Sequence, residues 1–148
     1  MSAPSHAGPS TPAARDWLLA GLIALAAALL YSFTFQTRTF CDGHGLVSLH
    51  VLQGEERYQH ALYLPLCDAL QGALGLDDPF AVLHLVSVLG GGLGLGAGYL
   101  VLRLCGAARF GALLALGLLA LSPALWFFGT TVHTQALLYG MVASLALL

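Results

Sequence analysis

FAVLHLVSVLGGGLGLGAGYLVL, residues 80–102, is an apolar run without Asp, Glu, Lys or Arg. It contains one histidine, His84. A helix that crosses the hydrocarbon core of a bilayer needs roughly 20 mostly apolar residues. An Asp-Asp-Pro triplet at 77–79 precedes the run. This order favours a helix start, because an Asp side chain caps free amides and Pro occupies a position whose N–H has no helical partner. The stretch predicts a transmembrane helix over about residues 80–102.

The composition of the whole chain agrees with a membrane environment. Hydrophobic residues make up 58% of the 148 residues, and charged residues only 8%. A soluble domain carries about 25% charged residues, so this chain has too few ionised groups to cover a surface in water. The formal net charge is −2 and lysine is absent, which leaves no basic field to attract nucleic acid. We therefore expect an all-α, polytopic membrane helical bundle and no nucleic-acid partner.

Three further apolar runs lie outside residues 80–102. WLLAGLIALAAALLYSFTF (17–35) has no charge and carries aromatic residues near its ends, as interfacial belts do. The alternative, a cleaved signal peptide, has a shorter apolar region of about 7–15 residues. The other runs cover 110–128 and 135–148, and the last is too short to cross a bilayer. The prediction is three full spans plus an incomplete fourth, in the front piece of a larger membrane protein or a truncated product of one.

The charge pattern predicts an orientation. Arg103 and Arg109 lie in a short connection without an acid, and such connections face the cytoplasm. The tail 1–16, rich in Ser, Pro and Ala, would then be a disordered cytoplasmic segment. Residues 36–78 would form the outer, periplasmic or extracytoplasmic loop, where two arginines face six acids for a local balance of −4.

The outer loop, about 43 residues long, exceeds a simple connector. Its semi-apolar stretches at 46–53 and 62–76 predict short helices on the membrane surface. CDGHG (41–45) predicts a tight bend, since its two glycines permit backbone angles that other residues resist. The bend would hold Asp42 and His44 at the membrane–water boundary. An Asp beside Gly is also a common turn former, and the residues alone leave both interpretations open.

Histidines and cysteines offer further alternatives. His84 is interpreted as a hydrogen-bonded packing residue of the second span. A divalent metal ion such as Mn²⁺ or Zn²⁺ is an open alternative, because carboxylate plus imidazole suits these ions, although no local H-x-x-x-H or C-x-x-C pattern supports it. The four candidate ligands expected on the outer side are Asp42, His44, His60 and His133. A Cys41–Cys67 disulfide across the loop is likewise open.

GGGLGLGAG (90–98) has glycines four residues apart, at Gly90, Gly94 and Gly98. A nucleotide-binding loop would need a preceding strand and a following Lys-Ser/Thr pair, and neither is present. Glycines at this spacing allow a second helix to approach closely. The run therefore predicts a helix-packing surface.

Three stretches resemble motifs of the GT-C glycosyltransferases, and most of all their protein O-mannosyltransferase-like branch. CDGHG resembles the glycine-and-acid turn after the first span. HALYLPL (60–66) resembles the His-Pro-Pro-Gly-Tyr-Pro-Leu motif, with Ala61-Leu62 in place of the proline pair. LSPALWFFGTTVHTQAL (121–137) resembles the Ser-Pro…Trp segment, with His133 about where the family has an acid.

The resemblance implies a polytopic enzyme that takes a sugar from a polyprenyl-phosphate carrier. Asp42 would be its general base. Acceptor or lipid phosphate would contact a set of polar side chains, namely His44, Arg57, His60, Tyr63 and His133. The alternatives are a non-catalytic assembly subunit and a transporter component built around His84 and the glycine run. Polar residues gathered at the interface, with almost nothing ionisable at mid-membrane, favour the enzyme.

Overall fold

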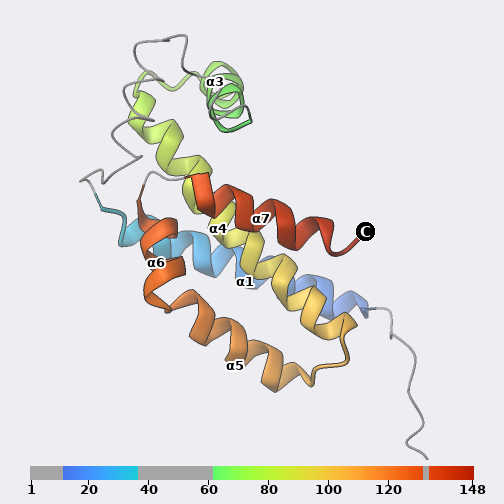
Figure 1. Cartoon of the computed structure of the whole chain (residues 1–148). Helices are drawn as coiled ribbons and strands as arrows, with labels where there is room; N and C mark the ends of the chain where they lie inside the picture. The colour runs from blue at the N-terminus through green and yellow to red at the C-terminus, as the bar shows by residue number, and fades with distance from the viewer. Residues whose placement is uncertain (1–11, 37–61, 132–133) are drawn as a thin grey trace, which may run out of the picture.

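The computed structural model describes residues 12–36, 62–131 and 134–148, and within these segments the chain is all-helical (Figure 1). This confirms the all-α part of the expected fold class. The helices are α1 (Ala14–Phe33), α3 (Tyr63–Leu74), α4 (Pro79–Leu104), α5 (Arg109–Ala120), α6 (Pro123–Thr130) and α7 (Thr134–Leu145).

Helix α4, 26 residues long, is the central element, and α1 and α7 pack along it (Figure 1). It begins where the Asp-Asp-Pro triplet predicts a start. The Asp78 carboxylate accepts a hydrogen bond from the Phe80 amide at 2.9 Å, and Pro79 is the first helical residue. The cap satisfies an amide that would otherwise lack a partner.

The glycine run of α4 packs against two helices of the same chain. A Cβ added at Gly90 would lie 2.7 Å from the Cα atom of Leu137 in α7. A Cβ at Gly96 would lie 2.7 Å from the carbonyl oxygen of Ala20, on α1. Gly90 and Gly96 thus serve different neighbours, and each neighbour's backbone approaches to a distance that a side chain would prevent.

Helix α1 begins at Ala14, three residues before the expected start at Trp17. The expected disordered tail, 1–16, is therefore too long, because residues 14–16 belong to α1. Its Oδ2 atom accepts a hydrogen bond from the Ala13 amide at 3.2 Å, which supports the first turn. Residues 1–11 lie outside the described segments.

The expected span 110–128 consists of two helices, so the prediction of one continuous helix needs correction. Helices α5 and α6 meet at an angle of 63°. Ser122 Oγ accepts from the Leu125 amide at 3.3 Å and so caps α6. Pro123 has no N–H to continue the hydrogen-bond ladder of α5. The Ser-Pro pair thus ends one helix and starts the next.

Two helices, α1 and α4, are long and apolar enough to cross a membrane, and the bent α5–α6 pair adds a third if it forms one span. This is consistent with an integral membrane protein. Helix α7 is apolar but has only 12 residues. Helix α3 lies within the stretch expected to form a surface helix and ends at Gly75, whose φ of 62° is in the left-handed region typical of helix ends. The other expected surface helix, 46–53, lies outside the described residues.

Candidate functional site

The loop 37–61 follows residues that pack beside the start of α4. The Phe35 ring stacks on the imidazole of His84, with ring centroids 3.5 Å apart, and meets the Phe80 ring edge-on at 5.9 Å. The Gln36 amide donates a hydrogen bond to the carbonyl oxygen of Thr130 at 2.7 Å. These contacts attach the last described residues before the loop to both α4 and the end of α6.

The loop returns at the same end of the bundle. The Tyr63 hydroxyl donates to the carbonyl oxygen of Leu83 at 3.1 Å and lies 3.1 Å from Ser87 Oγ. An apolar cluster surrounds this anchor, with residues from α3 and α4: Tyr63, Leu64, Cys67, Val82, Leu83 and Val86. Helix α3 is therefore fastened to the first two turns of α4.

The residues that flank segment 132–133, which contains the predicted site residue His133, lie at this same end. Thr130 precedes it and accepts from Gln36, while Leu137 follows it in α7 and packs on the Tyr63 cluster. The segments that contain the predicted site residues are thus attached at one end of the bundle. Five of those residues lie outside the described segments: Asp42, His44, Arg57, His60 and His133.

Tyr63 is the predicted site residue that the structure describes. Its side chain is 2% exposed and its hydroxyl bonds to α4. Burial raises the pKa of this phenol above its usual range, so it stays protonated. The structure gives Tyr63 a role in attaching α3, and a substrate contact by this residue stays a prediction.

Cys67 and His84 lie beside this anchor. Cys67 is a buried free thiol, and burial, with the nearby charge of Asp68, raises its pKa to about 12. Cys41, its proposed disulfide partner, lies outside the described residues. His84 packs on Phe35, as a packing residue should, but its buried Nε2 has no hydrogen-bond partner among the described residues. The sequence analysis interpreted His84 as hydrogen-bonded, and the described residues supply no such bond at Nε2.

A polar cluster that the sequence analysis missed lies at the opposite end of α4. Asp16 is 2% exposed, and its Oδ1 atom accepts from Tyr99 Oη at 3.1 Å, Arg103 Nε at 3.3 Å and Arg109 Nε at 3.0 Å. Arg103 also donates to the carbonyl oxygen of Ala107. One carboxylate thus joins the start of α1, the end of α4 and the start of α5.

A sequence signal for this cluster does exist. Asp16 immediately precedes the first apolar run, and Arg103 and Arg109 flank the connection between the second and third runs. The end of α1 that carries Asp16 lies beside that connection, so opposite charges meet at one end of the bundle. A buried carboxylate is stable only when paired and hydrogen-bonded, and both conditions hold here.

The described parts of the chain contain no group of three metal-ligating side chains from His, Cys, Asp or Glu. The four candidate metal ligands from the sequence lie outside these parts. Two cavities occur among the described helices, one between α1 and α5 and one between the α5–α6 bend and α7, and both are mainly apolar.

No protein-family model, curated protein or solved structure matches this chain. The family interpretation therefore depends on the three short motifs and on the order of the helices.

Proposed function

We propose that this chain is part of a membrane glycosyltransferase of the GT-C type. It would move a sugar from a polyprenyl-phosphate carrier to an acceptor hydroxyl on the outer face of the membrane. One observation supports this beyond the motifs. The described flanks of the loop that carries Asp42 are both attached to the first turns of α4, through Phe35 and Tyr63. The loop therefore starts and returns at one bundle end, where an interfacial site would form.

Asp42 is the general base in this proposal. The acceptor oxygen attacks the anomeric carbon of the sugar and forms the new C–O bond, while its proton passes to the Asp42 carboxylate. The bond between the anomeric carbon and the phosphate oxygen breaks, and the lipid phosphate leaves with the electron pair. A positioned carboxylate contributes to such a step by proton transfer, and correct placement of the two substrates contributes more.

The other predicted residues would orient the substrates. Arg57 is suited to the lipid phosphate because a guanidinium donates two parallel hydrogen bonds to phosphate oxygens. His44, His60 and His133 would contact the acceptor or the phosphate. Tyr63 would act mainly by fastening the segment that follows His60 to α4, given its buried hydroxyl.

The test compares Asp42→Asn with Glu55→Gln, an acid of the same loop expected to lie in a solvated turn. Membranes that contain each variant, made in the complete transferase of which this chain is proposed to be part, are supplied with mannosyl polyprenyl phosphate and a hydroxyl acceptor. We expect Asp42→Asn to abolish transfer because an amide does not accept the proton, while Glu55→Gln retains it. Protease protection should show equal membrane insertion. Wild-type transfer by Asp42→Asn would remove this residue from the mechanism.

A second candidate is a non-catalytic assembly subunit. It is favoured because the buried carboxylate and hydroxyl groups that the structure describes bond to other protein groups and do not line a cavity. The buried carboxylate of Asp16 is fully engaged in joining helices, and both cavities are mainly apolar. Such features suit lipid or protein contacts. This candidate would be favoured if both variants, Asp42→Asn and Glu55→Gln, kept wild-type transferase activity and the protein purified in a constant ratio with another membrane protein. A transporter component is less well supported, since ionisable groups in the described helices gather toward helix ends.

A further inference from the structure

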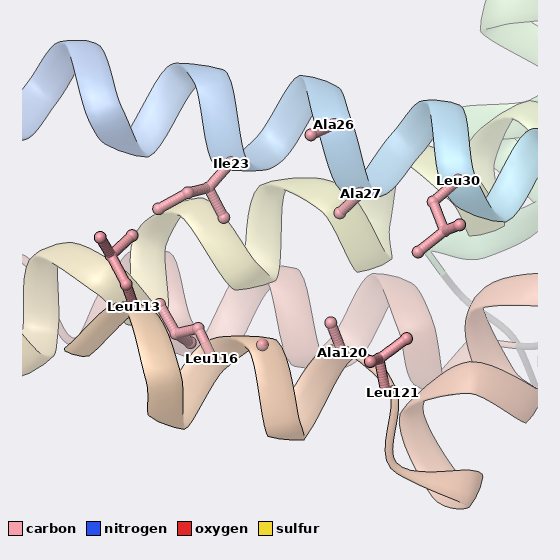
Figure 2. A pocket seen from close by; sticks show the side chains of 9 residues that line it. Ile23, Ala26, Ala27, Leu30, Leu113, Leu116, Ala120 and Leu121 are labelled. Atoms are coloured by element: carbon pink, nitrogen blue, oxygen red, sulfur yellow. The ribbon is translucent and has the colours of Figure 1, made fainter. Parts of the chain in front are cut away.

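Helices α1 and α5 run beside each other and are tied at two places. At one end Arg109 Nε lies 3.0 Å from Asp16 Oδ1. At the other, the Tyr31 hydroxyl donates to the carbonyl oxygen of Ala120 at 3.0 Å. Between the ties lies an apolar groove of about 310 Å³. Aliphatic side chains from both helices point into it, as Figure 2 shows, among them Ile23, Ala27, Leu30, Leu113, Leu116 and Ala120.

We propose that this groove binds one acyl chain of an anionic phospholipid, whose phosphate lies at the Arg109 end. The proposal requires that α1 and α5 lie in a bilayer, and it does not depend on glycosyl transfer. The residues that line the groove include none of the Tyr63 cluster, so the two sites are separate.

The two ties select a thin occupant. An α-helix with its side chains is about 10–12 Å across. Such a helix could enter between α1 and α5 only by breaking the Asp16–Arg109 ion pair and the Tyr31–Ala120 hydrogen bond. A methylene chain has no side chains and no backbone groups that need partners. It can lie between the helices while both ties remain.

The length of the groove region suits the same occupant. Asp16 and Tyr31 are 15 positions apart on α1, which corresponds to about 22 Å of helix at the usual rise. The acyl layer of one leaflet is about half of the 30 Å hydrocarbon core, so a chain that starts near Arg109 would end before it reaches the Tyr31 tie. A lipid with its phosphate near Arg109 would therefore place its chain alongside Ile23 and Leu116.

The charge at the Arg109 end favours an anionic headgroup. The described charged residues there are Arg15, Asp16, Arg103 and Arg109, with a formal sum of +2. The Arg109 side chain is 42% exposed, whereas the Asp16 side chain is only 2% exposed, so the positive partner faces outward. Arg109 also shares a face of α5 with Leu113 and Leu116, because residues spaced by three and four lie on one side of a helix.

Two glycine substitutions on α5 form a matched pair for the test. Gly117 lines the groove and Gly111 does not, yet an added Cβ at either position meets no atom within 4 Å. Gly117→Leu should fill the groove without disturbing the backbone, and Gly111→Leu should leave the groove open. Both changes remove a glycine from a helix, so their effects on helix propensity are alike. Equal circular dichroism spectra would show that both variants fold.

The probe is phosphatidylglycerol with a photoactivatable diazirine in its acyl chain, added to the full chain in phosphatidylcholine nanodiscs. We expect labelling on Ile23, Leu113 and Leu116, a several-fold loss in Gly117→Leu, and no loss in Gly111→Leu. Phosphatidylcholine with the same diazirine should label these residues less.

Three results would overturn the proposal. Unchanged labelling in Gly117→Leu would show that the lipid lies elsewhere. Equal labelling by both phospholipids would remove the role of the positive end. A cross-link between α5 helices of two molecules, formed through the groove residues, would identify a second copy of the chain as the occupant.

Discussion

At the scale of single residues, a few polar atoms decide how the apolar helices meet. The Tyr63 hydroxyl bonds to Leu83 and Ser87 on α4, and the Asp16 carboxylate bonds to three side chains on α4 and α5. An apolar side chain is strongly favoured to leave water, but it gains little when a protein neighbour replaces lipid. Hydrogen bonds and ion pairs between helices therefore add the directional preference that apolar contact lacks.

Removing the Tyr63 hydroxyl should weaken the attachment of α3. Tyr63→Phe keeps the ring in its apolar cluster and removes the hydrogen bond to Leu83 O, so we expect the free energy of unfolding to fall by about 1 kcal/mol. Thermal or denaturant unfolding in detergent measures this change.

Tyr139→Phe is the control. Tyr139 packs on the α4 glycines, and no hydrogen bond of its hydroxyl is found among the described residues. The control should have little effect. Equal destabilisation by the two variants would mean that the Tyr63 hydrogen bond does not hold α3.

At the scale of the elements, α4 holds the bundle together through its glycines. Because Gly92 and Gly96 face α1 while Gly90 and Gly94 face α7, one run of small residues serves two interfaces. A Cβ at Gly92 would lie 2.6 Å from the Ala24 carbonyl oxygen. Backbone atoms cannot move away as a flexible side chain can, so a larger residue would force the helices apart.

Gly96→Leu should separate α1 from α4. The new side chain would overlap the Ala20 backbone of α1, and overpacking of this kind typically costs about 1–3 kcal/mol. Unfolding in detergent, together with the distance between spin labels on α1 and α4, measures the effect. Gly111→Leu, at an open position of α5, is the matched control. A stability of Gly96→Leu equal to that of the control would contradict the close packing.

At the scale of the whole molecule, the two ends of the bundle differ in character. The start of α1 and the α4–α5 connection lie together at one end, joined by Asp16, Arg103 and Arg109. Phe35 and Tyr63, which flank the loop 37–61, lie at the other end of α4. The arginines would place the first end in the cytoplasm, which makes the sidedness of the molecule a testable prediction.

Cys105 and Cys67 provide natural probes for this prediction. Cys105 is exposed in the α4–α5 connection, whereas Cys67 is buried with its pKa raised to about 12. A membrane-impermeant maleimide at pH 8 should modify Cys105 from the cytoplasmic side only. Cys67 should stay unmodified from either side, because the thiolate is the reactive form and it accumulates only as the pH approaches the raised pKa.

A Cys41→Ser background and peptide mass spectrometry keep the two signals separate. Asp77→Cys, placed just before α4, serves as the opposite marker and should react from the outside. Modification of Cys105 from the outside would reverse the proposed orientation and place the Asp42 loop on the cytoplasmic side, against the proposed transferase.

The sequence by itself predicted the all-helical class, the apolar helices that are long enough to cross a membrane and the start of α4, because these depend on hydrophobic run length and on local capping by Asp78 and Pro79. It also indicated that the glycine run is a packing surface, since the four-residue spacing is a local pattern. The proposed catalytic role of Asp42 stays a prediction from motifs.

Only the tertiary structure decided that Asp16 lies inside the bundle, that the helices on either side of Ser122 and Pro123 meet at 63°, and that Tyr63 is fastened to α4. The physical reason is that each of these outcomes depends on partners far along the chain or on the direction in which a helix leaves a break. Hydropathy counts apolar residues along the sequence, and it carries no information about which carbonyl, carboxylate or backbone a side chain will meet in space.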